Sequence, residues 1–237
     1  MDFSDFDGTG NNGRAASGGF GGFHSWLGGP GMLSNQTFEE HFRCYPVIMM
    51  DSPQARDNAS YGGKLILPPS ALDKLTRLNI MYPMLFELEA ELPPTAASAP
   101  GDQSGPPLPT VRRTNAGVLE FTAEEGRAYL PQWMMQSLGI EPGAIVKITN
   151  TSLPLGRFVK IQPQSVDFLD ISDPRAVLEN ALRHFATLTE GDTITISYNA
   201  KLYDIKVLET KPAGKGICIV ETDLEVDFAA PVGYVEP

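Results

Sequence analysis

Cysteine and histidine are scarce in this sequence of 237 residues, which contains two cysteines and three histidines. Cys44 and Cys218 lie far apart, which is typical of free thiols in a reducing compartment and not of the disulfide framework of a small secreted domain. The histidines and cysteines never cluster at the spacing of metal ligands. We therefore expect no disulfide scaffold, no zinc or iron site and no cofactor.

Long apolar runs and an excess of basic residues are also lacking. No run approaches the roughly 18 residues that a membrane span needs, and the first residues lack the basic and apolar regions of a signal peptide. The net charge is −11, and residues 219–237 contain five acidic residues and no basic one. Such a surface repels phosphate backbones and anionic lipids. We expect a protein of the cytoplasm or nucleus, with neither nucleic acid as a partner nor insertion into a membrane.

Glycine and proline are present in excess, but the excess is confined to two segments. Ten of the 23 glycines lie in residues 1–34, and six of the 20 prolines lie in residues 91–110. Segments of this composition cannot bury enough apolar surface to become ordered. We predict a disordered Gly-rich tail over residues 1–34 and a mobile Pro-rich loop insertion over residues 91–110.

A weak internal repeat begins at two glycines that lie 63 residues apart. The letters GKLILP at residues 63–68 are echoed by GRAYLP at residues 126–131. Runs with three apolar residues in four follow at residues 85–88 and 145–148. Each copy predicts a strand, a short helix opened by a proline, a turn and a second strand. The residues expected to face the core are Leu72 and Leu75 in the first helix and Trp133, Met134 and Leu138 in the second.

Two strand-helix-strand units, each too small to bury its own apolar face, can complete one another about a pseudo-twofold axis. A six-stranded barrel with interlocked halves, the double-psi type, is built in this way. Because Leu-Pro also opens many unrelated short helices, the repeat alone leaves both interpretations open. The predicted fold is mainly β with short helices (α+β), with a double-psi β-barrel over residues 35–152.

A smaller β-rich α+β lobe is predicted over residues 153–237, ending in an acidic segment. Asp173 is expected to cap a helix that begins at Pro174, and apolar residues at 177, 178, 181, 182 and 185 share one face of it. Alternating apolar residues at 193–198 and 203–207 predict a hairpin that turns at residues 199–200. A buried strand is expected at residues 217–220.

Motifs for catalysis are weak. The G-x-G-x-x-G match at residues 8–13 follows no strand and opens no helix, so it does not indicate a nucleotide site. His41 and Cys44 could act as base and thiolate but have no third group to orient them, and Asp167 with Asp170 is more typical of caps and turn acceptors. No Asp-Thr-Gly or Asp-Ser-Gly triplet of an aspartic protease occurs. The residues favour a binding protein over an enzyme, and we predict no catalytic residue.

Several ordered blocks resemble the ubiquitin fusion degradation protein 1 family. The similarity extends from about residue 36 to residue 237 and is carried by residues 38–45, 62–72, 78–86, 117–121, 129–135, 162–171 and 226–237. The Gly-rich start and the Pro-rich loop depart from the family pattern.

The resemblance implies a double-psi barrel joined to a smaller lobe, as in the N domain of the AAA+ unfoldase called valosin-containing protein. It also implies a non-enzymatic adaptor that binds ubiquitin and polyubiquitin chains and recruits polyubiquitinated proteins to that unfoldase for extraction and proteasomal degradation. The adaptor would pair with the nuclear protein localization protein 4 family and act partly at the cytosolic face of the endoplasmic reticulum. In the family, the motifs for the unfoldase and for the partner lie in a tail beyond the folded domain. If this chain is a fragment, it should keep ubiquitin binding and lack both docking functions.

Ubiquitin is usually bound through a small apolar patch with a basic rim, which an acidic receptor with a few exposed apolar residues complements. The candidate contacts are Phe168, Leu169, Ile171, Val226 and Phe228, although burial between the lobes is the more frequent explanation for apolar residues of this kind. Two other functions stay open. One is an enzyme on a double-psi barrel scaffold, and the other is the N-terminal substrate-binding domain of an AAA+ protein.

Overall fold

The computed structural model describes residues 37–50, 59–92 and 111–234, and all of them belong to one compact unit, Gln36–Pro237. The predicted tail at residues 1–34 and most of the predicted loop at residues 91–110 lie outside the described residues. The described chain is mostly β with three short α-helices, as expected for an α+β protein. These helices are α2 (Pro69–Arg77), α3 (Gln132–Leu138) and α4 (Pro174–Leu182).

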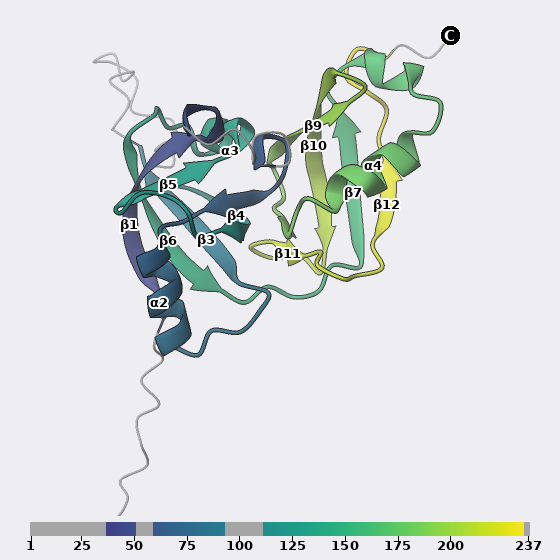
Figure 1. Cartoon of the computed structure of the whole chain (residues 1–237). Coiled ribbons are helices and arrows are strands. Elements are labelled where there is room, and N and C mark those ends of the chain that lie inside the picture. The colour runs from purple at the N-terminus through teal and green to yellow at the C-terminus, as the bar shows by residue number, and fades with distance from the viewer. Residues whose placement is uncertain (1–36, 51–58, 93–110, 235–237) are drawn as a thin grey trace, which may run out of the picture. The chain divides into compact units, whose positions relative to one another are not determined.

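Six strands form a closed barrel in the order β1-β5-β2-β4-β3-β6 (Figure 1). The strands are β1 (Glu39–Pro46), β2 (Lys64–Ile66), β3 (Leu85–Glu91), β4 (Val111–Glu120), β5 (Arg127–Leu130) and β6 (Ala144–Thr151). β1 pairs with β5 in parallel and with β6 in antiparallel orientation, and β4 pairs with β2 and β3 in the same two ways. Exchanging β1 with β4, β2 with β5 and β3 with β6 therefore leaves every pairing unchanged. The first strand of each half is held by the other half, so the halves interlock.

The sequence repeat coincides with this symmetry. Pro68 and Pro131 both stand at the N-cap, immediately before α2 and α3. The later leucines of the repeat, Leu75 and Leu138, are both fully buried. The predicted inward face of α3 is confirmed, because Trp133, Met134 and Leu138 are all buried.

The prediction for α2 is wrong at one position. Leu72 is 39% exposed, whereas Ala71 and Leu75 are buried. Residues 71 and 75 lie one above the other on the helix, so they define its inward stripe and place residue 72 about 100° away from it. The small side chain of Ala71 brings the helix close to the barrel.

The rest of the chain, called here the second lobe, contains a four-stranded sheet in the order β12-β7-β10-β9. Its strands are β7 (Phe158–Pro163), β9 (Thr193–Tyr198), β10 (Lys201–Lys211) and β12 (Glu225–Phe228). A short antiparallel pair is made by β8 (Thr187–Leu188) and β11 (Ile217–Cys218). Two 3₁₀ turns complete the described elements, η1 (Val47–Met49) and η2 (Val166–Asp170).

Local signals predicted much of the second lobe. Asp173 caps α4 by accepting a hydrogen bond from the backbone of Ala176, and α4 lies across the sheet (Figure 1). The hairpin of β9 and β10 turns at Asn199 and Ala200, which both have a positive φ, as a two-residue hairpin loop requires. The strand expected at residues 217–220 is shorter than predicted, because β11 ends at Cys218.

The barrel and the second lobe share one continuous hydrophobic core. The ring of Phe185 stacks on Trp133 at a centroid distance of 6.0 Å, and its Cδ1 lies 2.4 Å from where a Cβ would stand on Gly63. Only glycine allows the two backbones to approach this closely. The side chain of Asn115 in β4 donates to the Thr189 hydroxyl at 3.0 Å and to a backbone carbonyl at residue 215 at 2.7 Å. This seam holds the lobes as one unit.

Candidate functional site

The His41 and Cys44 pair is not arranged for catalysis. Both residues lie on β1, where successive side chains point to opposite faces, so His41 is exposed while Cys44 is fully buried. Burial raises the pKa of the Cys44 thiol to about 12, which keeps it protonated. The thiol is therefore a core group and not a thiolate nucleophile.

Asp167 and Asp170 lie at the surface beside η2. The Asp167 carboxylate pairs with the ammonium of Lys201 at 2.7 Å. The capping role that the sequence suggested for the two aspartates is performed by Ser165, whose hydroxyl accepts a hydrogen bond from the Asp167 backbone N–H. In the ranges that the structure describes, no three His, Cys, Asp or Glu side chains lie close enough to hold a metal ion, and no helix is long and apolar enough to cross a membrane.

The five candidate contacts occupy different environments. Phe168 is buried, with its ring 5.7 Å from that of Tyr203 and 6.1 Å from that of Phe228. Ile171 is also buried. Phe228 and Val226 are half-buried and pack against the core. Only the Leu169 side chain, which is 53% exposed, lies mainly in solvent. The partners of the Phe168 ring belong to the second lobe, so this ring packs within that lobe and not between the lobes.

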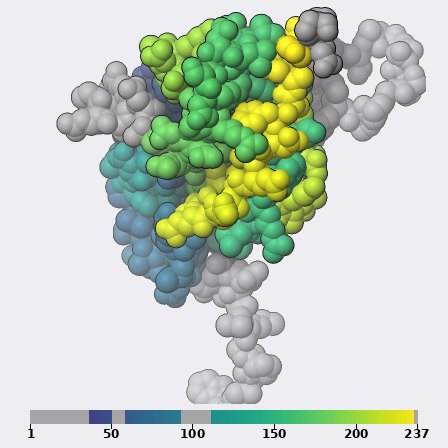
Figure 2. Space-filling model, turned by 90° about the vertical axis from the view of Figure 1, so that its right-hand side faces the viewer, coloured from purple at the N-terminus to yellow at the C-terminus, as the bar shows by residue number. Residues whose placement is uncertain are grey.

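The structure brings together a different surface, built around residues 219–225, here called the acidic ridge. Glu221, Asp223 and Glu225 are exposed, and the residues between them are half-buried. This alternation places the three carboxylates outward while Leu224 packs against the core. Among the described residues none of the three carboxylates forms an ion pair. In Figure 2 the yellow C-terminal segment that includes the ridge lies across one face of the molecule.

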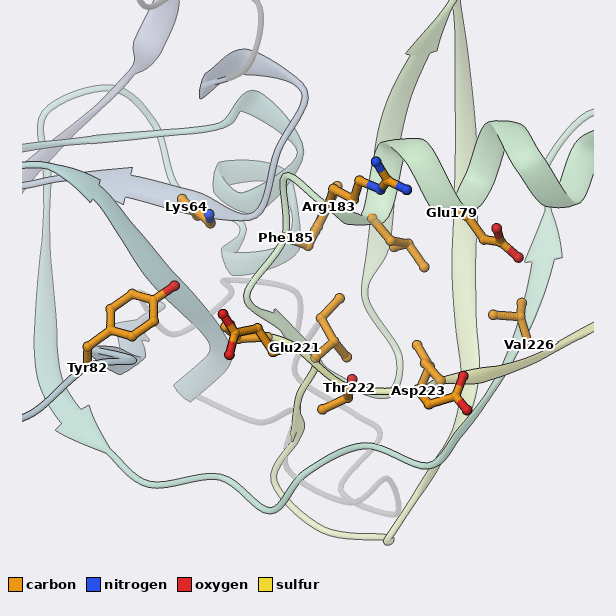
Figure 3. A pocket seen from close by; sticks show the side chains of 13 residues that line it. Lys64, Tyr82, Glu179, Arg183, Phe185, Glu221, Thr222, Asp223 and Val226 are labelled. Atoms are coloured by element: carbon orange, nitrogen blue, oxygen red, sulfur yellow. The ribbon is translucent and has the colours of Figure 1, made fainter.

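Three depressions lie next to one another on this face, and ridge residues line the first and the third of them. The first, with a volume of about 520 Å³, lies between the lobes, with Lys64 and Tyr82 on the barrel side and α4 on the other (Figure 3). The second is lined by Met81, Tyr82 and Leu155, and the third runs from Leu155 along the ridge. Because Tyr82 and Leu155 each line two depressions, the three form one continuous surface.

An apolar rim made of Met81, Tyr82 and Leu155 borders the acidic ridge. These side chains are 80%, 74% and 63% exposed, respectively. The loop that carries the first two is held by a backbone hydrogen bond from Ile80 to Leu75. Leu155 forms a backbone bridge with Cys218. The rim is therefore exposed on an ordered backbone.

Cations line the first and the third depression, whereas the second has none in its lining. Lys64 and Arg183 face the first depression together with Glu179 (Figure 3). Arg157 and Lys211 line the third, where the Lys211 ammonium lies 4.6 Å from the centre of the Phe158 ring and 3.5 Å from a Glu209 oxygen. The first and third depressions are thus lined by cations as well as by carboxylates of the ridge.

The sequence indicated only part of this surface. The run of acidic residues after residue 219 was visible, and Val226 was named and lines the first depression. Met81, Tyr82 and Leu155 were missed, because an apolar residue in a loop gives no sign of whether it is buried. The proline at 83, which ends the loop, was the only local signal that residues 81 and 82 lie outside a strand.

Comparisons with known proteins agree with this two-part architecture. The family model for the N-terminal subdomain 1 of ubiquitin fusion degradation protein UFD1 matches residues 38–154, and the model for subdomain 2 matches residues 155–231. Together they include the barrel and all four strands of the larger sheet in the second lobe.

Individual relatives are similar over most of the chain. Ubiquitin fusion degradation protein 1 of Saccharomyces cerevisiae is 58% identical over 92% of this chain and 56% of its own length. The Schizosaccharomyces pombe protein of that name is 52% identical over 85% of this chain and 54% of its own. The human ubiquitin recognition factor in ER-associated degradation protein 1 is 49% identical over 88% and 62%. The chain spans little more than half the length of these curated relatives, and it belongs to the ubiquitin fusion degradation protein 1 family.

Proposed function

We propose that this chain is the ubiquitin-binding part of a non-enzymatic adaptor that recruits polyubiquitinated proteins to an AAA+ unfoldase for extraction and proteasomal degradation. The observation that carries the proposal is the match of both N-terminal subdomain models across residues 38–231. The human relative is named as a ubiquitin recognition factor in ER-associated degradation. Its name supports a role in recognition during ER-associated degradation. We propose that the chain acts partly at the cytosolic face of the endoplasmic reticulum and otherwise in the cytoplasm and nucleus.

We also propose a specific fold type for the barrel and boundaries for the two domains. The interlocked pairing of the two halves supports a double-psi barrel over residues 35–152, and we propose that the second lobe, residues 153–237, completes an architecture similar to the N domain of the unfoldase. The partner adaptor of the nuclear protein localization protein 4 family and the valosin-containing-protein unfoldase would dock on parts of the full-length protein beyond this chain.

The adaptor role requires weak contacts to single ubiquitin units and stronger binding to chains. Weak single contacts allow cargo to be released quickly, and engaging several units of one chain multiplies modest affinities through effective concentration. We therefore expect the affinity to increase with the number of ubiquitin units, without a new contact at any one of them.

An NMR titration of the ¹⁵N-labelled 237-residue chain with monoubiquitin and lysine-linked polyubiquitin tests the proposal. We expect fast-exchange amide shifts with monoubiquitin and tighter binding to tetraubiquitin. The absence of shifts at millimolar ubiquitin, with no gain from chain length, would contradict the proposed function.

A further inference from the structure

We propose that one ubiquitin unit docks on the apolar rim (Met81, Tyr82 and Leu155) with its basic border on the acidic ridge (residues 219–225). This inference rests on the proposed function and specifies its contact surface. The rim and ridge come from both lobes, so the surface exists only when the lobes are joined as the seam holds them.

The apolar side chains of the rim are exposed to solvent and lie close together. Three large apolar side chains with exposures between 63% and 80% gather where the depressions meet. A grouped apolar patch bordered by polar residues marks an interaction surface more often than isolated exposed residues do. Tyrosine is also among the residues that most often contribute strongly to binding energy.

Backbone hydrogen bonds hold the residues of the rim in place. The backbone N–H of Ile80 donates to the Leu75 carbonyl at 3.0 Å, and the Gly156 and Cys218 backbones hydrogen-bond around Leu155 at 2.8 Å. Since these bonds hold the backbone on both sides of the surface, a partner would order few additional groups on binding. Such preorganisation reduces the entropic cost of association.

The carboxylates of the ridge favour a partner with a basic surface. The carboxylates of Glu221, Asp223 and Glu225 lie beside the apolar rim and form no ion pair with any described residue, whereas Asp227, the next carboxylate, pairs with Lys160 at 3.4 Å. Lys64 and Arg183 line the first depression and Arg157 and Lys211 line the third. A partner that presents a small apolar patch with a basic border therefore matches the ridge itself, where its cations would face unpaired carboxylates. Ubiquitin has this surface chemistry. The net charge of −11 adds a long-range attraction to such a basic border.

Apolar truncation tests the rim. The full chain carrying Tyr82→Ala or Leu155→Ala is titrated with monoubiquitin and compared with Ile145→Ala, which truncates an apolar residue of similar exposure, 56%, on β6 of the barrel. We expect each rim variant to weaken binding about tenfold and the Ile145 variant to remain within about twofold. A ¹⁵N spectrum of each variant verifies that it is folded.

Charge reversal tests the ridge. Asp223→Lys combined with Glu225→Lys should weaken binding and reduce its dependence on salt, and the exposed Glu141→Lys control should do neither. In the unmodified chain, amide shifts should centre on residues 80–83, 155 and 219–225. If the unmodified chain binds but both rim variants bind within twofold of it, or if the shifts centre on the face that carries Leu169, the docking surface is wrong and the proposed function stands. If the unmodified chain does not bind, both are overturned.

Discussion

Asp192 carries a charge in the seam between the lobes at neutral pH, and we predict that its contribution to the stability of the protein is smaller there than in mild acid. The carboxyl is buried, with 8% of the residue exposed, and accepts a hydrogen bond of 2.5 Å from the Thr114 hydroxyl. Burial raises its pKa from 3.8 to about 6, and hydrogen bonds from Thr114 and Ser137 oppose only part of this shift. Desolvation therefore dominates.

The sign of the pH dependence follows from proton binding. Between about pH 4 and pH 6 the native state holds a proton on Asp192 that the unfolded chain has already lost. The contribution of Asp192 to the free energy of unfolding must then fall as the pH rises through this window, because stability increases with pH only where the unfolded state binds more protons. A shift of about two units corresponds to about 3 kcal/mol, fully present below pH 4 and lost above about pH 6.

Asp192→Asn removes this titration and leaves an amide oxygen that can accept from the same hydroxyls. The difference in unfolding free energy between variant and parent, measured by urea denaturation from pH 4 to pH 8, should shift in favour of the variant by about 2 to 3 kcal/mol. Taking the difference cancels the titration of all other groups.

A surface carboxylate provides the matched control. Asp204 is exposed and accepts a hydrogen bond from the Thr195 hydroxyl at 2.6 Å, so Asp204→Asn makes the same chemical change without desolvation. The corresponding difference should stay within about 0.5 kcal/mol across the range. A flat difference for Asp192→Asn, or one that favours the parent as the pH rises, would refute the reasoning.

Two further predictions concern the packing of the seam. Gly63→Ala would place a methyl group 2.4 Å from Cδ1 of Phe185, so we expect a loss of about 1 to 3 kcal/mol in urea denaturation as the lobes are forced apart. Trp133→Phe removes the indole N–H that donates to the buried Gly62 carbonyl at 2.8 Å, and its urea midpoint should fall by an amount equivalent to about 1 to 3 kcal/mol.

Gly214→Ala is the control for the glycine substitution, because a methyl group there meets nothing within 4 Å. Its midpoint should stay close to that of the parent. Equal midpoints for the two alanine variants would contradict the close approach of the lobes, and an unchanged midpoint for the tryptophan variant would show that the indole hydrogen bond adds nothing to stability.

Much of the local structure could be predicted because its causes are local. Pro68 and Pro131 immediately precede the two repeated helices, Asp173 caps α4, and the hairpin turns at two residues with positive φ. Each signal acts within a few residues of its own position. The prediction was wrong where the tertiary environment decides whether a side chain is buried. Leu72 is an example, because its exposure depends on how α2 lies against the barrel.

The barrel itself was only partly predictable. No strand was assigned to β1, although it joins the two halves by pairing with β5 and β6. Its partners lie about 85 to 110 residues away in the chain, and no local pattern specifies such a pairing. The repeat nevertheless indicated that two similar units exist, because each repeats the same short-range order of strand, helix and strand.

The sequence by itself determined the family, the existence of two related strand-helix-strand units and the acidic character of the chain. Tertiary structure alone decided which apolar residues are exposed and which charges lie beside them. Phe168 and Leu169 are neighbours in the chain, yet one is buried and the other is exposed. Tyr82, Leu155 and Glu221 are far apart in the chain and meet on one surface. Burial and proximity depend on the packing of the two lobes across the seam, which no single segment encodes.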